Sequence, residues 1–298
     1  MKTKALVYII LAGMLWGTSG IFVKLLTPYG FTAPQLSLIR GTISFLAMLT
    51  YTLIFNKSIM RIDLKDLIFS LFIGITLYGT ATLYYSSMQM TSVATAVVLM
   101  YTAPIYVTAF SVAFLKEKSS RLKTSSIALM LIGCALTSGI VGGLEFNTLG
   151  ILLGVLSGIV YAAYNVITKI ALARGLNPIT LSLYGFLFMA LTALITARPS
   201  QIFSNASEAP AVTVPLMIGL GVFTFVLPYF FYTLSMRDLP AGTASALSII
   251  EPLAATLFSA VIFFEIPSLV SALGILLILL ATFMLGKAEN MATSESSE

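Results

Sequence analysis

Ten stretches of mostly apolar residues follow one another along the chain, with short polar turns between them. A helix needs about 20 such residues to cross the hydrocarbon core of a bilayer. The ten stretches comprise residues 5–26, 35–55, 66–88, 91–115, 123–140, 148–171, 178–197, 212–234, 240–264 and 268–286. Glycine and proline mark several of the breaks, as in Gly175-Leu176-Asn177-Pro178. The pattern therefore predicts an all-α integral membrane protein with ten transmembrane helices.

The composition agrees with this prediction. Of the 298 residues, 58% are hydrophobic and 9% are charged, whereas a soluble domain carries about 25% charged residues. The first apolar stretch is longer than the core of a signal peptide, and no clear cleavage site follows it, so we expect a retained helix. The net charge of +5 does not indicate nucleic acid, because the basic residues lie in short loops.

The distribution of lysine and arginine predicts the orientation. Cytoplasmic loops of membrane proteins are rich in these residues. If the N-terminus is cytoplasmic, that side carries Lys2, Lys4, Lys57, Arg61, Lys65, Lys116, Lys118, Arg121, Lys123, Arg174, Arg237 and Lys287. The opposite side then carries only Arg198. We therefore expect both termini in the cytoplasm, with the Ser- and Glu-rich segment 287–298 as a disordered tail.

The two halves of the chain resemble each other. A shift of 145 residues pairs Gly13 with Gly158, and a shift of 148 residues gives 11 identities in the 36-residue window that begins at Tyr84. The sequence thus predicts one five-helix repeat at 5–140 and a second at 148–286. Because five is odd, the second repeat should enter the membrane inverted. Inverted repeats around a central cavity are typical of transporters.

The same segments resemble the EamA-type branch of the drug/metabolite transporter superfamily. The residues that carry the likeness are 15–20 with Lys24, Arg40, 94–104, 161–169, and 244–252 with Glu265. The resemblance implies a multi-pass carrier of the bacterial inner (plasma) membrane, typically an exporter of amino acids or related metabolites. It leaves the substrate open.

Glu251 is the strongest candidate for a functional residue. It lies near the middle of the ninth stretch, beside Pro252. An ionised group at this depth costs at least a few kcal/mol and needs a partner or a wet cavity. The acid is therefore a candidate for substrate binding or proton coupling; the alternative is a structural role at a helix break. Pro104 and Pro252 occupy matching positions in the two repeats and are candidate hinges or simple kinks.

Aromatic and polar residues within the predicted spans are the other candidates. A cavity lined by aromatic rings and a few polar groups is a common small-molecule site. The residues that fit this description are Trp16, Tyr78, Tyr101, Tyr161, Tyr164, Asn165, Tyr229 and Ser248. Packing with internally bonded hydroxyl groups is the alternative for each.

Three cations lie inside predicted spans: Lys24, Arg40 and Lys169. The default interpretation is that their side chains reach the lipid headgroups. The alternative is recognition of a substrate carboxylate.

Together these features predict a gradient-driven carrier of small organic metabolites that works by alternating access. The partners are the lipid bilayer and a small-molecule substrate, with proton coupling as an option and no nucleic acid; a monomer and a homodimer both remain open. A lipid flippase of the same fold and a non-transporting membrane subunit are the alternatives. The sequence has no histidine, no phosphate-binding loop and no metal-ligand cluster, so we expect no enzyme chemistry, metal or cofactor.

Overall fold

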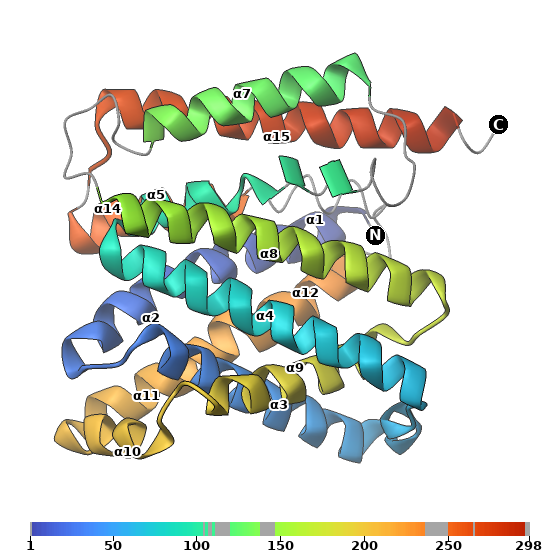
Figure 1. Cartoon of the computed structure of the whole chain (residues 1–298), viewed down its shortest axis with the longest axis vertical. Coiled ribbons are helices and arrows are strands. Elements are labelled where there is room, and N and C mark those ends of the chain that lie inside the picture. Colours follow the sequence, from blue (N-terminus) through green and yellow to red (C-terminus); the bar gives the residue numbers. More distant parts are fainter. Residues whose placement is uncertain are drawn as a thin grey trace.

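The structure is a computed structural model of the chain, and it describes residues 2–103, 105–106, 109–110, 120–137, 147–235, 250–264 and 266–295. Across these residues the regular secondary structure is helical. Most helices run roughly parallel or antiparallel to one another, as Figure 1 shows. This arrangement agrees with the predicted all-α class.

The helices of the first half follow the predicted stretches closely. They are α1 (Lys2–Gly17), α2 (Ser19–Leu26), η1 (Thr27–Tyr29), α3 (Ala33–Phe55), η2 (Lys57–Met60), α4 (Leu64–Met90), α5 (Val93–Met100) and α7 (Arg121–Thr137). Side chains fix where the helices begin, because they satisfy backbone N–H groups that have no partner within the helix. The Asp63 carboxylate accepts from the Asp66 N–H at 2.8 Å, and the Ser92 hydroxyl accepts from the Thr95 N–H at 3.1 Å. Ser92 thereby fixes the start of α5, the helix whose last residue directly precedes the candidate residue Tyr101.

The helices of the second half are more often broken. They are α8 (Thr148–Ala173), α9 (Pro178–Leu194), α10 (Pro199–Glu208), α11 (Pro210–Gly221), the π-helical segment η3 (Val222–Val226), α12 (Leu227–Ser235), α14 (Ile250–Phe263) and α15 (Leu269–Glu295). Helix α15 continues to Glu295, into the segment 287–298 for which the sequence predicts a disordered tail. This tail contains alanine, methionine and glutamate, which are good helix formers and allow the preceding helix to extend.

Several helices in the described residues are long and apolar enough to cross a membrane. Four satisfy both conditions: Val7–Tyr29, Ala33–Phe55, Leu64–Met90 and Thr148–Thr168. A fifth span results if Ile179–Leu194 is joined with Pro199–Glu208 across a bend of 88°. Shorter apolar helices occupy Thr124–Gly133, Pro210–Val226 and Leu269–Ala281. The protein is therefore a multi-pass membrane protein by length and composition of its helices, and the total of ten spans stays a prediction.

The most extensive helix–helix interfaces join the two halves of the chain. Helix α4 packs on α8 and α9, α3 on α9, α1 on α12 and α14, α5 on α8, and α7 on α15. The α7–α15 pair forms a layer at the top of Figure 1. The two halves thus share one bundle, and residues far apart in sequence meet in its interior.

Glycines permit the closest of these contacts. A Cβ atom on Gly17 would lie 2.8 Å from Cβ of Ala254 and 2.9 Å from the backbone nitrogen of Ala255, which joins α1 to α14. A Cβ atom on Gly13 would approach Ile250, and one on Gly158 would approach Thr102. The last two contacts are equivalent in the two halves, because the shift of 145 residues takes Gly13 to Gly158 and the shift of 148 residues takes Thr102 to Ile250. Small residues of this kind let membrane helices approach closely.

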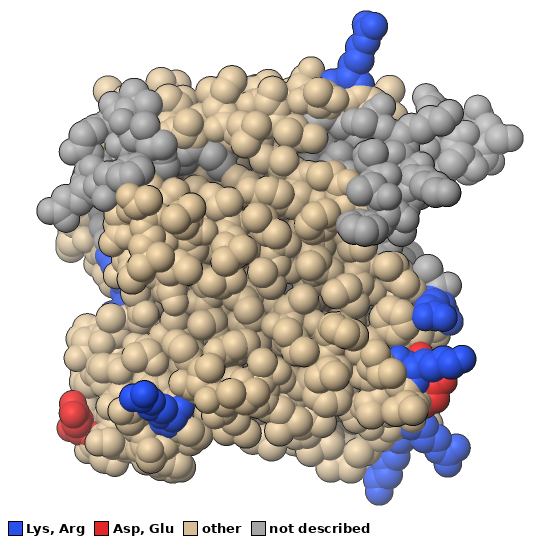
Figure 2. All heavy atoms as spheres, viewed as in Figure 1, with Lys and Arg blue, Asp and Glu red and all other residues tan. Residues whose placement is uncertain are grey.

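Charged side chains gather at the ends of the helices. Figure 2 shows a broad face without Lys, Arg, Asp or Glu between its two ends, and most of the charged residues lie at the right-hand end. Both chain ends in Figure 1 lie toward the same side of the view. An uncharged band between two charged ends is the surface that a bilayer requires.

Candidate functional site

The Glu251 carboxylate lies where helices from the two halves meet. Glu251 is the second residue of α14, and Tyr101 directly follows α5. The Tyr101 hydroxyl donates to Oε2 of Glu251 at 2.8 Å. Both residues are half-buried, so the contact is partly accessible although it lies inside predicted spans. The carboxylate therefore has the hydrogen-bonding partner that its depth demands.

Arg40 does not reach toward the lipid headgroups, and the default prediction for this residue is wrong. From α3, its Nη1 donates to the Tyr85 hydroxyl at 2.8 Å and its Nη2 donates to the Thr224 carbonyl at 3.2 Å. The guanidinium carbon also lies 4.2 Å from the centre of the Phe225 ring. Inside the protein the guanidinium has two hydrogen-bond acceptors and an aromatic face. It would lose these contacts if the side chain extended to the lipid headgroups. Its Nε is buried without a hydrogen-bond partner in the described part of the chain.

A break in a helix supplies the carbonyl that Arg40 binds. Thr224 lies in the π-helical segment η3, between α11 and α12. In a regular α-helix the donor to this carbonyl would be the N–H of residue 228, but residue 228 is proline. The Thr224 carbonyl is thus available to the guanidinium. Single π-helical turns of this kind occur often at functional sites.

Aromatic rings connect the acid with helices α1, α4, α8 and α12. The Tyr161 and Tyr164 rings stack with centres 5.7 Å apart, and the Trp16 ring lies 5.6 Å from that of Tyr232. Tyr84 and Tyr161 lie within electrostatic range of Glu251, as does Arg40. One continuous group thus contains an acid, a guanidinium and several tyrosines. We call it the central cluster: Trp16, Arg40, Tyr84, Tyr85, Tyr101, Tyr161, Tyr164, Tyr232 and Glu251.

The sequence profile of the EamA-like transporter family matches this chain twice, over residues 3–139 and 148–287. The chain belongs to the EamA-like transporter family. It is 28% identical to an uncharacterized transporter of Archaeoglobus fulgidus, over 89% of this chain and 90% of the relative. It is 25% identical to the uncharacterized transporter YwfM of Bacillus subtilis, over 94% and 93%. A solved crystal structure that is 20% identical has the same fold, with a TM-score of 0.63 over 99% of each chain.

Three further candidates of this EamA-like transporter have partners other than Glu251. The Tyr78 hydroxyl shares a hydrogen bond with the Thr196 hydroxyl, near the bend between α9 and α10. The Asn165 amide donates to the Tyr161 carbonyl on its own helix at 2.8 Å. The Lys24 ammonium lies 4.4 Å from the centre of the Phe263 ring, at the end of α14. Asn165 thus adjoins the central cluster through Tyr161, whereas the described partners of Tyr78 and Lys24 lie outside it.

Other candidates fall outside what the structure describes. Pro104 and Ser248 lie outside the described residues, and the side chains of Tyr229, Lys169 and Pro252 are likewise not described. Pro252 belongs to α14 by its backbone. The hinge role of the two prolines stays a prediction.

Several residues of the central cluster were not among the candidates from sequence, nor was Phe225, which contacts Arg40. Tyr84 and Tyr232 pair with each other under the 148-residue shift, and this match was the available signal for both. Tyr85 and Phe225 gave no signal, because their role depends on the direction of Arg40 from another helix. Pro228, four residues after Thr224, was the available signal for the break in the helix. Among the residues the structure describes, no group of His, Cys, Asp and Glu side chains is arranged to hold a metal ion.

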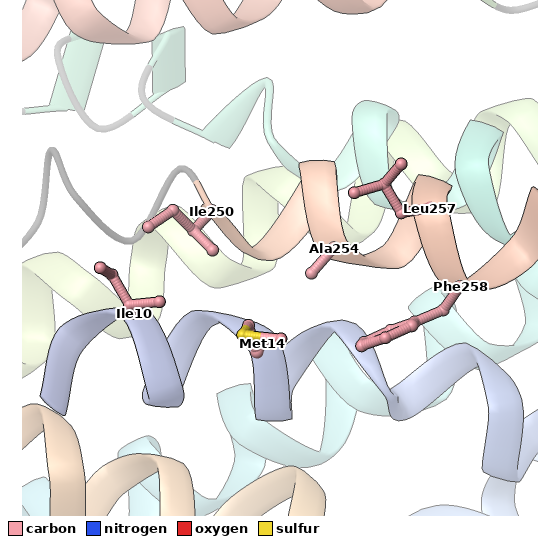
Figure 3. A pocket seen from close by; sticks show the side chains of 6 residues that line it. All are labelled: Ile10, Met14, Ile250, Ala254, Leu257 and Phe258. Carbon is pink, nitrogen blue, oxygen red and sulfur yellow. The ribbon is translucent and has the colours of Figure 1, made fainter. Parts of the chain in front are cut away.

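An apolar groove lies outside the central cluster, between α1 and α14. Its lining residues are Ile10, Met14, Ile250, Ala254, Leu257 and Phe258, and Figure 3 shows the two helices side by side with these side chains. Ile10, Met14 and Leu257 are 40%, 42% and 55% exposed. The groove therefore opens to the surroundings of the bundle rather than to its interior.

Proposed function

We propose that this EamA-like transporter carries a small organic metabolite with both a positive and a negative group, with an amino acid as the leading class. The observation that carries the proposal is the central cluster, where Glu251 and Arg40 lie within electrostatic range of each other. A carboxylate offers a partner to an ammonium group. A guanidinium offers planar donors to a carboxylate. The neighbouring rings suit the apolar part of such a molecule.

Accessibility supports a binding role for the cluster. Trp16, Arg40, Tyr101, Tyr161 and Glu251 are each half-buried, although all lie inside predicted spans. Side chains that only pack at this depth are normally sealed, as Met189 is with 0% exposure. The unpartnered Nε of Arg40 adds a buried donor that a substrate oxygen would satisfy.

Alternating access between two inverted five-helix repeats is the proposed mechanism. The helix–helix interfaces support it. If each predicted span is replaced by its counterpart in the other half, each interface maps onto another interface that is also present. The α1–α14 contact corresponds to α8–α5, and the α1–α12 contact corresponds to α8–α4. One family profile matches the chain twice, over 3–139 and 148–287, and these ranges lie close to the predicted repeats 5–140 and 148–286. In transporters of this design the substrate site lies near the midplane between the repeats.

We further propose an energy source, a direction and a location for transport. The sequence has no phosphate-binding loop, so we propose that an ion gradient drives transport, with protons coupled through Glu251. Export and the bacterial inner membrane rest on the family likeness. Both termini in the cytoplasm rest on the distribution of lysine and arginine.

Transport by purified protein in liposomes tests the proposal. A thermal-shift screen against a metabolite panel first identifies ligands, because a bound ligand raises the apparent stability. We then expect saturable flux of these ligands that responds to an imposed pH gradient. Glu251→Gln should abolish the response to the gradient, and Arg40→Gln should raise KM for substrates with a carboxylate. Tyr51→Phe, which changes a 41% exposed ring, is the matched control.

Three outcomes would contradict the proposal in different ways. Full gradient-coupled flux in Glu251→Gln would remove the acid from the mechanism. No rise in KM in Arg40→Gln, or the same rise for substrates with and without a carboxylate, would remove the guanidinium from recognition. Absence of any flux in the wild type would favour the non-transporting subunit.

A lipid flippase is the second candidate, and the groove between α1 and α14 favours it because a flippase needs a path open to lipid. The groove is lined by apolar side chains alone. However, it offers no partner to a polar headgroup that must cross the membrane. Each polar group that crosses without a partner costs free energy, and this disfavours a flippase.

A further inference from the structure

We propose that the groove between α1 and α14 is a binding site for a resident phospholipid, with an acyl chain in the groove and the phosphate at Lys24. The site is distinct from the central cluster and does not depend on the proposed substrate. Three features point to this site: the apolar lining of the groove, its length along α14, and a cation one turn beyond its outer end.

The lining suits a hydrocarbon chain. All six residues that form the groove are apolar, and its volume is about 180 Å³. Pockets for drug-sized ligands are larger, at about 300–1,000 Å³. A narrow apolar channel of this size fits a slender chain better than a compact metabolite. In Figure 3, Ile10 and Met14 on α1 face the space that Ala254 and Phe258 border on α14.

Exposed apolar residues beside the groove indicate that it opens to lipid and not to water. Val261 and Phe264 continue the same end of α14 and are 72% and 84% exposed. Exposed apolar side chains on a membrane-spanning bundle face acyl chains, because water is absent from the hydrocarbon core. The groove is therefore filled from the lipid phase.

The length of the groove matches one leaflet. From Ile250 to Phe258 the helix rises about 12 Å, and from Phe258 to Phe263 it rises about 7.5 Å more. The groove itself thus covers most of one leaflet, whose hydrocarbon is about 15 Å thick, and the path on to Phe263, about 19.5 Å in all, reaches the headgroup level. A chain that starts near Phe263 would thus end near Ile250, at mid-membrane.

A cation marks the headgroup end. Lys24 lies in the last turn of α2, and its Nζ is 4.4 Å from the centre of the Phe263 ring. A lysine at this level attracts lipid phosphate, and its flexible stem lies along apolar surface. The positive charge and the apolar groove together match the two parts of one phospholipid.

The inner end of the groove adjoins the central cluster. Ile250 lines the groove and directly precedes Glu251, and a Cβ atom on Gly17 would lie 3.1 Å from the Glu251 carbonyl oxygen. A chain in the groove therefore packs against the α1–α14 contact that positions the acid. We expect the lipid to stabilise this contact.

Lipid binding to purified full-length protein tests the proposal. The probe is palmitoyl-oleoyl phosphatidylglycerol, added to delipidated protein in detergent and followed by native mass spectrometry and thermal unfolding. We expect one retained lipid per chain and a higher melting temperature. Met14→Trp, which fills the groove, should weaken binding at least tenfold, and Lys24→Gln should weaken it severalfold.

Two matched controls and a direct mapping complete the design. Leu276→Trp adds the same ring to a 61% exposed site on α15, and Lys57→Gln removes an exposed charge elsewhere. Both should bind lipid like the wild type. A phospholipid with a photoreactive acyl chain should label α1 and α14 of the wild-type protein, which avoids any effect of substitution on folding.

Equal lipid retention in Met14→Trp and the wild type would overturn the site. Labelling spread evenly over exposed helices, including α15, would reduce the lipid to ordinary bilayer contact and would also overturn it. Faster flipping of headgroup-labelled phospholipid by proteoliposomes than by empty liposomes would show a transported rather than a resident lipid. The first two results leave the proposed function standing, whereas phospholipid flipping would overturn the resident lipid and also favour the lipid flippase over metabolite transport.

Discussion

One hydroxyl group connects the two halves of the chain at the buried acid. Tyr101 belongs to the first half and Glu251 to the second, and their side chains meet at 2.8 Å. A hydrogen bond to a charged group contributes about 1.5–3 kcal/mol. Because this pair lies between α5 and α14, its energy also holds two helices together.

Tyr101→Phe removes this hydroxyl and leaves the ring. We expect thermal unfolding to show a loss of about 1–3 kcal/mol, because the carboxylate loses a partner. Substrate flux in liposomes should fall as well. Tyr51→Phe makes the same chemical change on an exposed ring of α3 and should alter neither quantity. Unchanged stability and flux in Tyr101→Phe would show that the contact is incidental.

Sequence could predict the residues of the site better than their directions. Glu251 was evident as a lone acid in an apolar stretch, and Tyr101 was evident from its depth. Arg40 was identified, but its inward direction depends on the rotation of α3 and on Tyr85 from α4. Depth along a helix follows from sequence, whereas the partner on the next helix follows from packing.

At the scale of elements, a π-helical break connects α11 with α12 and receives Arg40. The break combines a proline without an N–H and a threonine whose hydroxyl bonds to the Leu220 carbonyl. The Thr224 carbonyl is then partnered by Arg40 from α3. The segment therefore links the two halves, because a side chain of the first half takes the place of a backbone N–H of the second half.

Pro228→Ala restores the N–H that a regular helix would use. We expect η3 to shift toward α-helix and the Arg40 contact to weaken, because the Thr224 carbonyl gains a competing donor. Flux in liposomes should fall while the melting temperature stays equal or rises, since proline inside a helix is costly. Flux equal to that of the wild type would mean that the break has no part in transport.

Gly17→Ala tests the close approach of α1 and α14. The added Cβ would meet the Ala255 backbone nitrogen at 2.9 Å, so the helices must move apart. We expect a loss of about 1–3 kcal/mol in thermal unfolding, as for other overpacked contacts. Gly79→Ala is the control, because its Cβ would meet only a Val160 methyl group at 3.2 Å. Equal stability of the two variants would contradict the tight contact.

At the scale of the whole molecule, sequence predicted the all-helical membrane class and the two matched halves. Periodicity and length are enough for that, because the bilayer fixes the length of a span. The bend of 88° after α9 was not predicted, because Arg198, whose φ is 47°, gives no sequence signal for a left-handed turn. The pairing of helices across the halves likewise came from packing.

Accessibility labelling tests the arrangement of the chain in the membrane. In a Cys134→Ala background, single cysteines replace Lys4, Met291 and Ser204, which are exposed residues of α1, α15 and α10. We expect a membrane-impermeant thiol reagent to label only Ser204→Cys in intact cells, and the other two after permeabilisation. Labelling of Lys4→Cys and Met291→Cys from different sides would refute an even number of spans.

Glu251 has no equivalent carboxylate in the first half of the chain. The position equivalent to Glu251 is Ala103, which is 2% exposed. A duplicated scaffold whose copies were identical would treat its two sides of the membrane alike, and its outward and inward forms would be mirror images with equal free energy. A single carboxylate in one copy abolishes that equality. For a carrier that exchanges the shapes of its halves, the resting population is then biased to one side even without a gradient, and forward and reverse rates have different limits.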